Sequence, residues 1–163
     1  MFDSFRSFFL VVFQLHLLIY VAPICIRLRR QPLSIITTLT GLTSIFKSYP
    51  SVSDLSLYLA MLSLHTNIFS RTRPLRRWLM AGMRYLFLAF SMLSYAVLLG
   101  PAFLHLWMYA GSGNANFFYA ITLVYSLAQI ILVADALYAM VRVDWETNEG
   151  KEAVSEGKKV VQI

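Results

Sequence analysis

Two long apolar stretches of this sequence are joined by a short segment that reads His105-Leu-Trp-Met-Tyr-Ala-Gly-Ser-Gly-Asn-Ala-Asn-Phe-Phe-Tyr119. The segment combines a Gly-Ser-Gly turn with two asparagines and five aromatic rings. Glycine allows the backbone to reverse sharply, and Trp and Tyr are enriched where a helix leaves a bilayer. The segment therefore predicts the point at which one membrane span ends and the next begins.

The composition indicates an integral membrane protein. Hydrophobic residues make up 58% of the 163 residues, charged residues make up 13%, and the mean hydropathy is +0.64. A soluble domain of this size would carry more apolar surface than it could bury. The pI of about 9.7 does not indicate a nucleic-acid-binding protein, because the basic residues lie at the ends of apolar runs and form no continuous face.

We expect an all-α, polytopic transmembrane helix bundle with about five spans, since a span needs about 20 residues. The two runs that follow the first are short, so they form either two thin spans, which we favour, or one re-entrant hairpin. The fourth run is long and is interrupted at Gly100-Pro101. The five runs are roughly Ser7–Ile26, Pro32–Phe46, Asp54–Phe69, Trp78–Tyr109 and Phe117–Val141.

The basic residues predict the orientation of these spans. Of the fourteen Lys and Arg, all but Arg6 and Lys47 fall on one side of the five-span arrangement, and that side is cytoplasmic by the positive-inside rule. The segment 109–119 then lies on the far side, which is lumenal in a eukaryote. Residues 1–143 are expected to form the transmembrane region, and residues 144–163, which have little to bury, a flexible cytosolic tail.

We find no set of residues that predicts catalysis, a metal site or a cofactor. The three histidines, His16, His65 and His105, lie on different runs and lack metal-ligand spacing. The single cysteine, Cys25, lies in apolar surroundings, where a thiol is normally unreactive. No two carboxylates are expected to share a lumenal pocket.

Two polar positions inside the last two spans have structural interpretations. Asp135 and Arg84 lie at matching depths on adjacent antiparallel runs, which predicts a structural ion pair, because an unpaired charge at this depth is unfavourable. Snorkelling of both side chains to the interface and a functional role of the pair are the alternatives. Gln129 is expected to form a hydrogen bond to a neighbouring helix.

The segment 109–119 leaves two interpretations open. Its rings fit an aromatic belt, with Asn116 capping the last helix. Alternatively, the carboxamides bind phosphate and sugar oxygens while the rings contact the sugar or acyl chains of a glycolipid. The candidate lipid- and glycan-binding residues are Tyr109, Asn114, Asn116, Phe117, Phe118 and Tyr119.

The stretch from His105 to Thr122 resembles the carboxy-terminal signature of the PIG-U family. The stretches Ile45–Tyr58 and Ser7–Pro23 resemble further family segments, as does Gln129–Asp135 together with Tyr138-Ala139. The resemblance covers nearly the whole chain up to about Arg142. Family members are far longer and often have glycine where this chain has Ser53, so we expect this chain to be a carboxy-terminal part of a longer one.

The resemblance implies a non-catalytic subunit of the glycosylphosphatidylinositol (GPI) transamidase, which attaches GPI anchors to proteins in the endoplasmic reticulum membrane. The subunit would help to hold the GPI lipid, and a caspase-like partner subunit would supply the bond-breaking groups. The implied fold is the carboxy-terminal part of a mannosyltransferase-like membrane fold. Two alternatives are a fragment of a glycosyltransferase that uses a dolichol-linked sugar and a lipid-scaffold or transporter bundle.

The predicted topology can be tested with inserted glycosylation acceptor sequences. An acceptor placed after Gly111 should be glycosylated, because that loop would lie in the lumen, whereas one placed near Gly150 should not. The readout is an endoglycosidase-sensitive shift on a gel. The reverse pattern would contradict the topology and, with it, a lumenal site.

Overall fold

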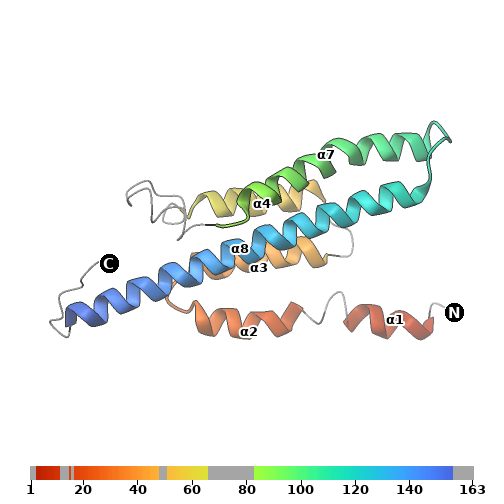
Figure 1. Cartoon of the computed structure of the whole chain (residues 1–163). Helices are drawn as coiled ribbons and strands as arrows, with labels where there is room; N and C mark the ends of the chain where they lie inside the picture. The colour runs from red at the N-terminus through yellow and green to blue at the C-terminus, as the bar shows by residue number, and fades with distance from the viewer. Residues whose placement is uncertain (1–2, 12–14, 16, 48–50, 66–82, 156–163) are drawn as a thin grey trace.

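The computed structural model describes residues 3–11, 15, 17–47, 51–65 and 83–155, and helices are its main elements (Figure 1). The all-α class is therefore confirmed for the described part of the chain. The helices are α1 (Asp3–Leu10), α2 (Leu17–Arg27), α3 (Pro32–Phe46), α4 (Val52–Ser63), α7 (Leu86–Met108) and α8 (Ala115–Ser155).

Two helices are long and apolar enough to cross a membrane, namely α7 with 23 residues and the part of α8 from Ala115 to Trp145 with 31 residues. At a rise of 1.5 Å per residue, 23 residues extend about 34 Å, slightly more than the hydrocarbon thickness of a bilayer. Helices α2, α3 and α4 are apolar but shorter. Several membrane spans are thus plausible, while the count of five and the choice between two thin spans and a re-entrant hairpin stay predictions.

The helices differ from the sequence expectations in four places. The first run contains two helices, α1 and α2. In the described part of the fourth run, the helix begins only at Leu86. The end of the third run and the start of the fourth fall within residues 66–82, which lie outside the described residues. Pro101 does not interrupt α7; a helix accommodates proline when its neighbours tolerate the missing N–H. The expected tail 144–163 begins as a continuation of α8, and its flexibility is untested.

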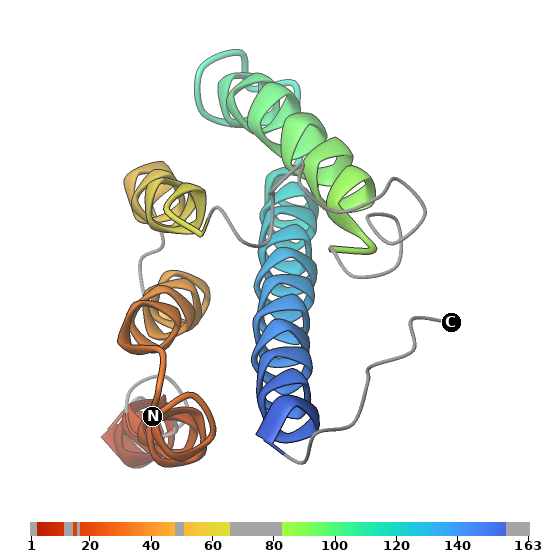
Figure 2. The ribbon, with the colours of Figure 1, turned by 90° about the vertical axis from the view of Figure 1, so that its left-hand side faces the viewer.

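Helix α8 is the centre of the bundle. Figure 2 shows α2, α3 and α4 in a row along one side of α8, while α7 lies at another side. The core around α8 combines large side chains with alanines that allow helices to approach closely. Its buried residues are Leu55, Tyr58, Leu62, Ala89, Leu93, Ala128, Leu132, Val133, Ala136 and Met140.

The contact between α3 and α8 depends on small and hydroxylated side chains. A Cβ atom at Gly41 would lie 2.7 Å from Val133 Cγ2 and 2.8 Å from Tyr58 Cε2, so only glycine fits at this close approach. Nearer the end of α3, the Ser44 hydroxyl lies 3.2 Å from Gln129 Oε1. The expected hydrogen bond of Gln129 to a neighbouring helix is therefore confirmed.

A buried carboxylate joins the start of α3 to the far end of α8. The Asp144 side chain accepts hydrogen bonds from Arg27 Nη1 at 2.8 Å and Gln31 Nε2 at 3.1 Å, although Asp144 is only 6% exposed. A buried carboxylate is strongly unfavourable without such partners. Because Arg27 precedes α3 while Ser44 lies near its end, these two contacts set the register of α3 along α8.

A second buried carboxylate, that of Asp135, binds the backbone at the start of α7. Its two oxygens accept the backbone N–H groups of Arg84 at 2.9 Å and Tyr85 at 2.7 Å. The Arg84 guanidinium instead lies over the Tyr138 ring, 5.1 Å from its centroid. The structure thus brings Arg84 and Asp135 together through the Arg84 backbone. The physical reason is that the first N–H groups of a helix lack partners within the helix, whereas an exposed guanidinium is hydrated.

Removal of the Asp135 carboxylate should destabilise the bundle, because two N–H groups at the start of α7 would lose a charged acceptor. We expect Asp135→Ala to lower the free energy of unfolding by about 2–4 kcal/mol, measured by thermal unfolding in detergent. Arg84→Ala is the matched control. It keeps the backbone N–H and should cost about 1 kcal/mol or less. Equal losses for both variants would instead support the side-chain ion pair.

Candidate functional site

The turn between α7 and α8 occupies residues 109–114, and its backbone satisfies the end of α7. The N–H groups of Tyr109 and Ala110 both donate to the carbonyl of His105, at 2.9 and 3.0 Å. Gly111 follows with a φ of +61°, a conformation that disfavours residues with a Cβ. The predicted Gly-Ser-Gly turn is therefore where the chain reverses.

Gly113 brings the turn back against the last turns of α7. Its N–H donates to the Leu106 carbonyl at 3.0 Å. A Cβ atom at Gly113 would lie 3.0 Å from both the carbonyl carbon and Cβ of Leu106 and 3.1 Å from the Trp107 nitrogen. Because two of these three neighbours are backbone atoms, they cannot rotate away, and this tight contact favours glycine.

Asn114 is the residue that caps α8. Its Oδ1 accepts the backbone N–H of Asn116 at 3.0 Å, and its carbonyl accepts the N–H of Phe117 at 3.1 Å. The sequence interpretation assigns this role to Asn116, but α8 begins at Ala115, and a cap residue must precede the helix. The Asn114 NH₂ group takes no part in the cap and is available as a donor.

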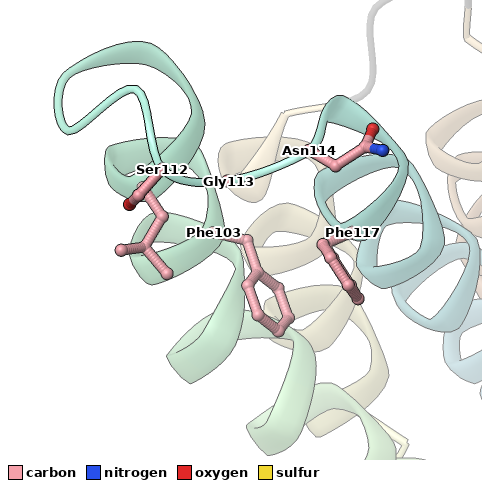
Figure 3. A pocket seen from close by; sticks show the side chains of 6 residues that line it. Phe103, Ser112, Gly113, Asn114 and Phe117 are labelled. Carbon is pink, nitrogen blue, oxygen red and sulfur yellow. The ribbon is translucent and has the colours of Figure 1, made fainter.

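A pocket of about 210 Å³ lies beneath this turn. Phe103 and Leu106 of α7 and Phe117 of α8 form its apolar walls, while Ser112, Gly113 and Asn114 line the turn side. Figure 3 shows the rings of Phe103 and Phe117 side by side below the turn, with the Asn114 carboxamide directed away from them. The two rings stack with centroids 5.8 Å apart.

Further rings surround the turn. Trp107 stacks on Phe118 at 6.1 Å and His105 on Tyr109 at 5.5 Å. Several rings remain largely exposed, with Tyr109 at 79%, Phe117 at 60% and Tyr119 at 63%. Exposed rings at the end of a membrane hairpin offer flat apolar faces, which suit a headgroup layer, the face of a sugar or an acyl chain.

The structure brings together only some of the predicted site residues. Asn114 and Phe117 line the pocket, whereas Tyr109, Asn116, Phe118 and Tyr119 do not. At 100° per residue, Tyr119 lies nearly opposite Phe117 around α8. Sequence reasoning missed Phe103 and Leu106. The sequence signal that could have identified them is their three-residue spacing on the side of α7 where Ala89 and Ala96 are buried.

The chemistry of the pocket is that of binding. Two phenyl rings and a leucine line it with apolar surface, and Ser112 and Asn114 are the polar residues at its edge; the Asn114 carboxamide is directed away from the rings. An apolar recess with a few polar groups at its edge is typical of small-molecule sites.

Comparison with known proteins gives a consistent result. The family described as GPI transamidase subunit PIG-U matches residues 1–125. The GPI transamidase component GAB1 homolog of Schizosaccharomyces pombe is 41% identical over 148 residues, which are 91% of this chain and 34% of that protein. The GPI-anchor transamidase component PIGU of Homo sapiens is 37% identical over 150 residues, 92% of this chain and 32% of that protein.

The GPI transamidase component GAB1 of Saccharomyces cerevisiae is 34% identical over 146 residues, which are 90% of this chain and 34% of that protein. This chain thus spans about a third of the length of the curated relatives that it matches. The similarity, by contrast, extends over nearly all of this chain.

The close approach of Gly113 can be tested against a second glycine. Gly113→Ala should lower the free energy of unfolding by about 1–3 kcal/mol, because the added methyl group overlaps the α7 backbone. Gly100→Ala is the control, since a Cβ there meets nothing within 4 Å, and it should be neutral or stabilising by about 0.5–1 kcal/mol. Thermal unfolding in detergent measures both, and equal effects would contradict the close approach.

Proposed function

This chain belongs to the PIG-U family, and from that membership we propose that it acts as a membrane subunit of a GPI transamidase, in the attachment of GPI anchors to proteins in the endoplasmic reticulum membrane. Its task in this proposal is to help bind the GPI lipid. The observation that carries the proposal is the pocket at the α7–α8 turn, where apolar walls meet hydrogen-bonding groups.

The chemistry of the pocket is complementary to a glycolipid. Phe103 and Phe117 contact the hydrophobic face of a sugar ring or the first part of an acyl chain. The Asn114 NH₂ group donates to phosphate or hydroxyl oxygens, because its Oδ1 is already engaged in the cap. Asn116 and Tyr119, which lie at another side of α8, would extend the same surface around the helix.

The length of α8 supports a position of the turn at the level of lipid headgroups. From Ala115 to Trp145 the helix has 31 residues, about 46 Å, whereas the hydrocarbon core is about 30 Å thick. With Arg27 and Asp144 at the cytosolic interface, about ten residues of α8 project beyond the hydrocarbon on the lumenal side. The glycan of a GPI lipid would occupy this level.

The proposal assigns no bond-breaking to this chain. A caspase-like subunit of the same complex would remove the signal peptide and join the new carboxyl end to the ethanolamine of the lipid. The partners are therefore the other transamidase subunits and the GPI glycolipid, in a multi-pass arrangement with a cytosolic carboxy terminus.

Substitution of Asn114 separates lipid binding from the helix cap. Asn114→Asp keeps the capping oxygen and places a negative charge at a helix N-terminus, where it is favourable. It removes the NH₂ donor and repels phosphate. Combined with Asn116→Ala, it should lower GPI transfer by a full-length family member at least tenfold, because a hydrogen bond to a charged group contributes about 1.5–3 kcal/mol.

Two controls complete this test. The double variant must assemble with the other subunits as the wild type does, and Ser53→Ala, a change at the start of α4, should leave transfer normal. Photoreactive GPI analogues report lipid occupancy directly. Normal transfer and normal lipid crosslinking in a stably assembled double variant would show that residues 109–119 are only a turn.

A further inference from the structure

The hydroxyl of Tyr125 on α8 is buried and has no hydrogen-bond partner among the described residues. The Gln129 carboxamide lies one helical turn along α8 and close to this hydroxyl, but the two groups do not meet in hydrogen-bond geometry. A buried polar group without a partner is unfavourable, because it has given up its hydrogen bonds to water, and native proteins contain few of them. The Tyr125 hydroxyl therefore needs a partner within the bundle.

On the other side of Gln129, the Ser44 hydroxyl has more acceptors than it has hydrogens. Its oxygen lies 2.8 Å from the Gly41 carbonyl oxygen and 3.2 Å from Gln129 Oε1. A hydroxyl carries a single hydrogen, and the shorter contact, within α3, takes it. The Ser44 oxygen then faces Gln129 Oε1 with its lone pairs only, so a donor is required at this position of Gln129.

A half turn of the Gln129 carboxamide satisfies both neighbours. The oxygen and the NH₂ group of a carboxamide are nearly the same size, so the packing stays as it is. The NH₂ group then donates to the Ser44 oxygen, and Oε1 accepts from the Tyr125 hydroxyl. The result is a chain of hydrogen bonds that runs from Tyr125 through Gln129 and Ser44 to the Gly41 carbonyl.

Close packing of α3 on α8 supports this chain. Gln129 is only 2% exposed, and a Cβ atom at Gly41 would lie 2.7 Å from Val133 Cγ2. The two helices thus touch about one turn away from the contact of Ser44 with Gln129. A water molecule at Tyr125 would satisfy that hydroxyl but would leave the Ser44 oxygen facing Gln129 Oε1. The contacts of Ser44 therefore favour the chain over a water molecule.

We propose that Tyr125 is a positioning residue for the pocket at the α7–α8 turn, because its hydroxyl holds α8 against the last turn of α3 through this chain. Ser44 lies two residues before the end of α3, and Figure 1 shows α8 continuing beyond that end toward the turn. Phe117 in the pocket wall is eight residues from Tyr125, about 12 Å along the helix. This inference rests on the proposed function, since it assumes that the pocket binds lipid.

The first test follows the Tyr125 hydroxyl in the intact, affinity-purified complex that contains the full-length protein. Tyrosine labelled with ¹³C at Cζ is incorporated at position 125 alone and observed by solid-state NMR. A hydroxyl that donates gains phenolate character, so its Cζ resonance moves toward that of phenolate, whereas one that only accepts moves the other way. We expect the displacement of a donor.

Three variants identify the partners of the labelled hydroxyl. Gln129→Met, which keeps the volume of the side chain, should abolish the displacement. Ser44→Ala should reduce it, because hydrogen bonds in a chain strengthen one another. Thr40→Ala is the control, since the Thr40 hydroxyl bonds only within α3, to the Ile36 carbonyl, and should leave the resonance unchanged. A resonance unaffected by both Gln129→Met and Ser44→Ala, or one displaced as for an acceptor, would overturn the inference.

The second test measures the crosslinking of photoreactive GPI analogues in the assembled complex. Tyr125→Phe removes only the hydroxyl and should lower the yield about two- to tenfold, the factor that one neutral hydrogen bond contributes to an equilibrium. Tyr95→Phe removes the same atom from a ring on α7 that is 65% exposed, and should leave the yield normal. Normal crosslinking with Tyr125→Phe would overturn the positioning role while the proposed function stands. A wild-type complex that does not crosslink the analogues would contradict the proposed function itself.

Discussion

The arrangement of this bundle depends on how α8 accommodates three buried polar side chains, which contact different neighbouring elements. Hydrocarbon provides neither donors nor acceptors, so each group needs a partner from a neighbouring helix. Gln129 meets Ser44 of α3, Asp135 meets the backbone at the start of α7, and Asp144 meets Arg27 and Gln31. Apolar contacts alone would let the helices slide, whereas these directional contacts define one register along α8.

This register also positions the pocket at the α7–α8 turn. The pocket lies at the turn of the α7–α8 hairpin and is lined by residues of both helices. Phe103 and Gly113 fix the turn against α7, and Asp135 fixes the other end of the same helix. Both ends of α7 are therefore held against α8, which fixes the walls of the pocket.

Hydropathy predicted the helical class and the two long helices, because a stretch of more than 20 apolar residues is long enough to cross a bilayer and too apolar for a solvated surface. It also placed Gln129 correctly, since an amide within a span must bond to another helix. It could not predict that Asp135 would accept hydrogen bonds from the backbone at Arg84, because charge and depth do not specify which atoms meet.

The N-cap of α8 was ambiguous for a similar reason. Two asparagines lie two residues apart, and only the position of the first helical residue decides between them. Phe103 escaped notice because its spacing from Leu106 becomes informative only once the side of α7 that faces α8 is known.

The hydrogen bonds of Asp135 also bear on how the protein enters the membrane. As α8 leaves the insertion machinery, an unpartnered carboxylate in the half of the span that lies farther from the α7–α8 turn opposes transfer into lipid. Its acceptor oxygens are satisfied only when the first turn of α7 is alongside. Helix α7 could enter the bilayer alone, but α8 would remain within the insertion machinery until it had paired with α7. We therefore expect the hairpin to enter the bilayer as one unit. Because α7 is synthesised before α8, its first N–H groups are already present when the Asp135 carboxylate needs them.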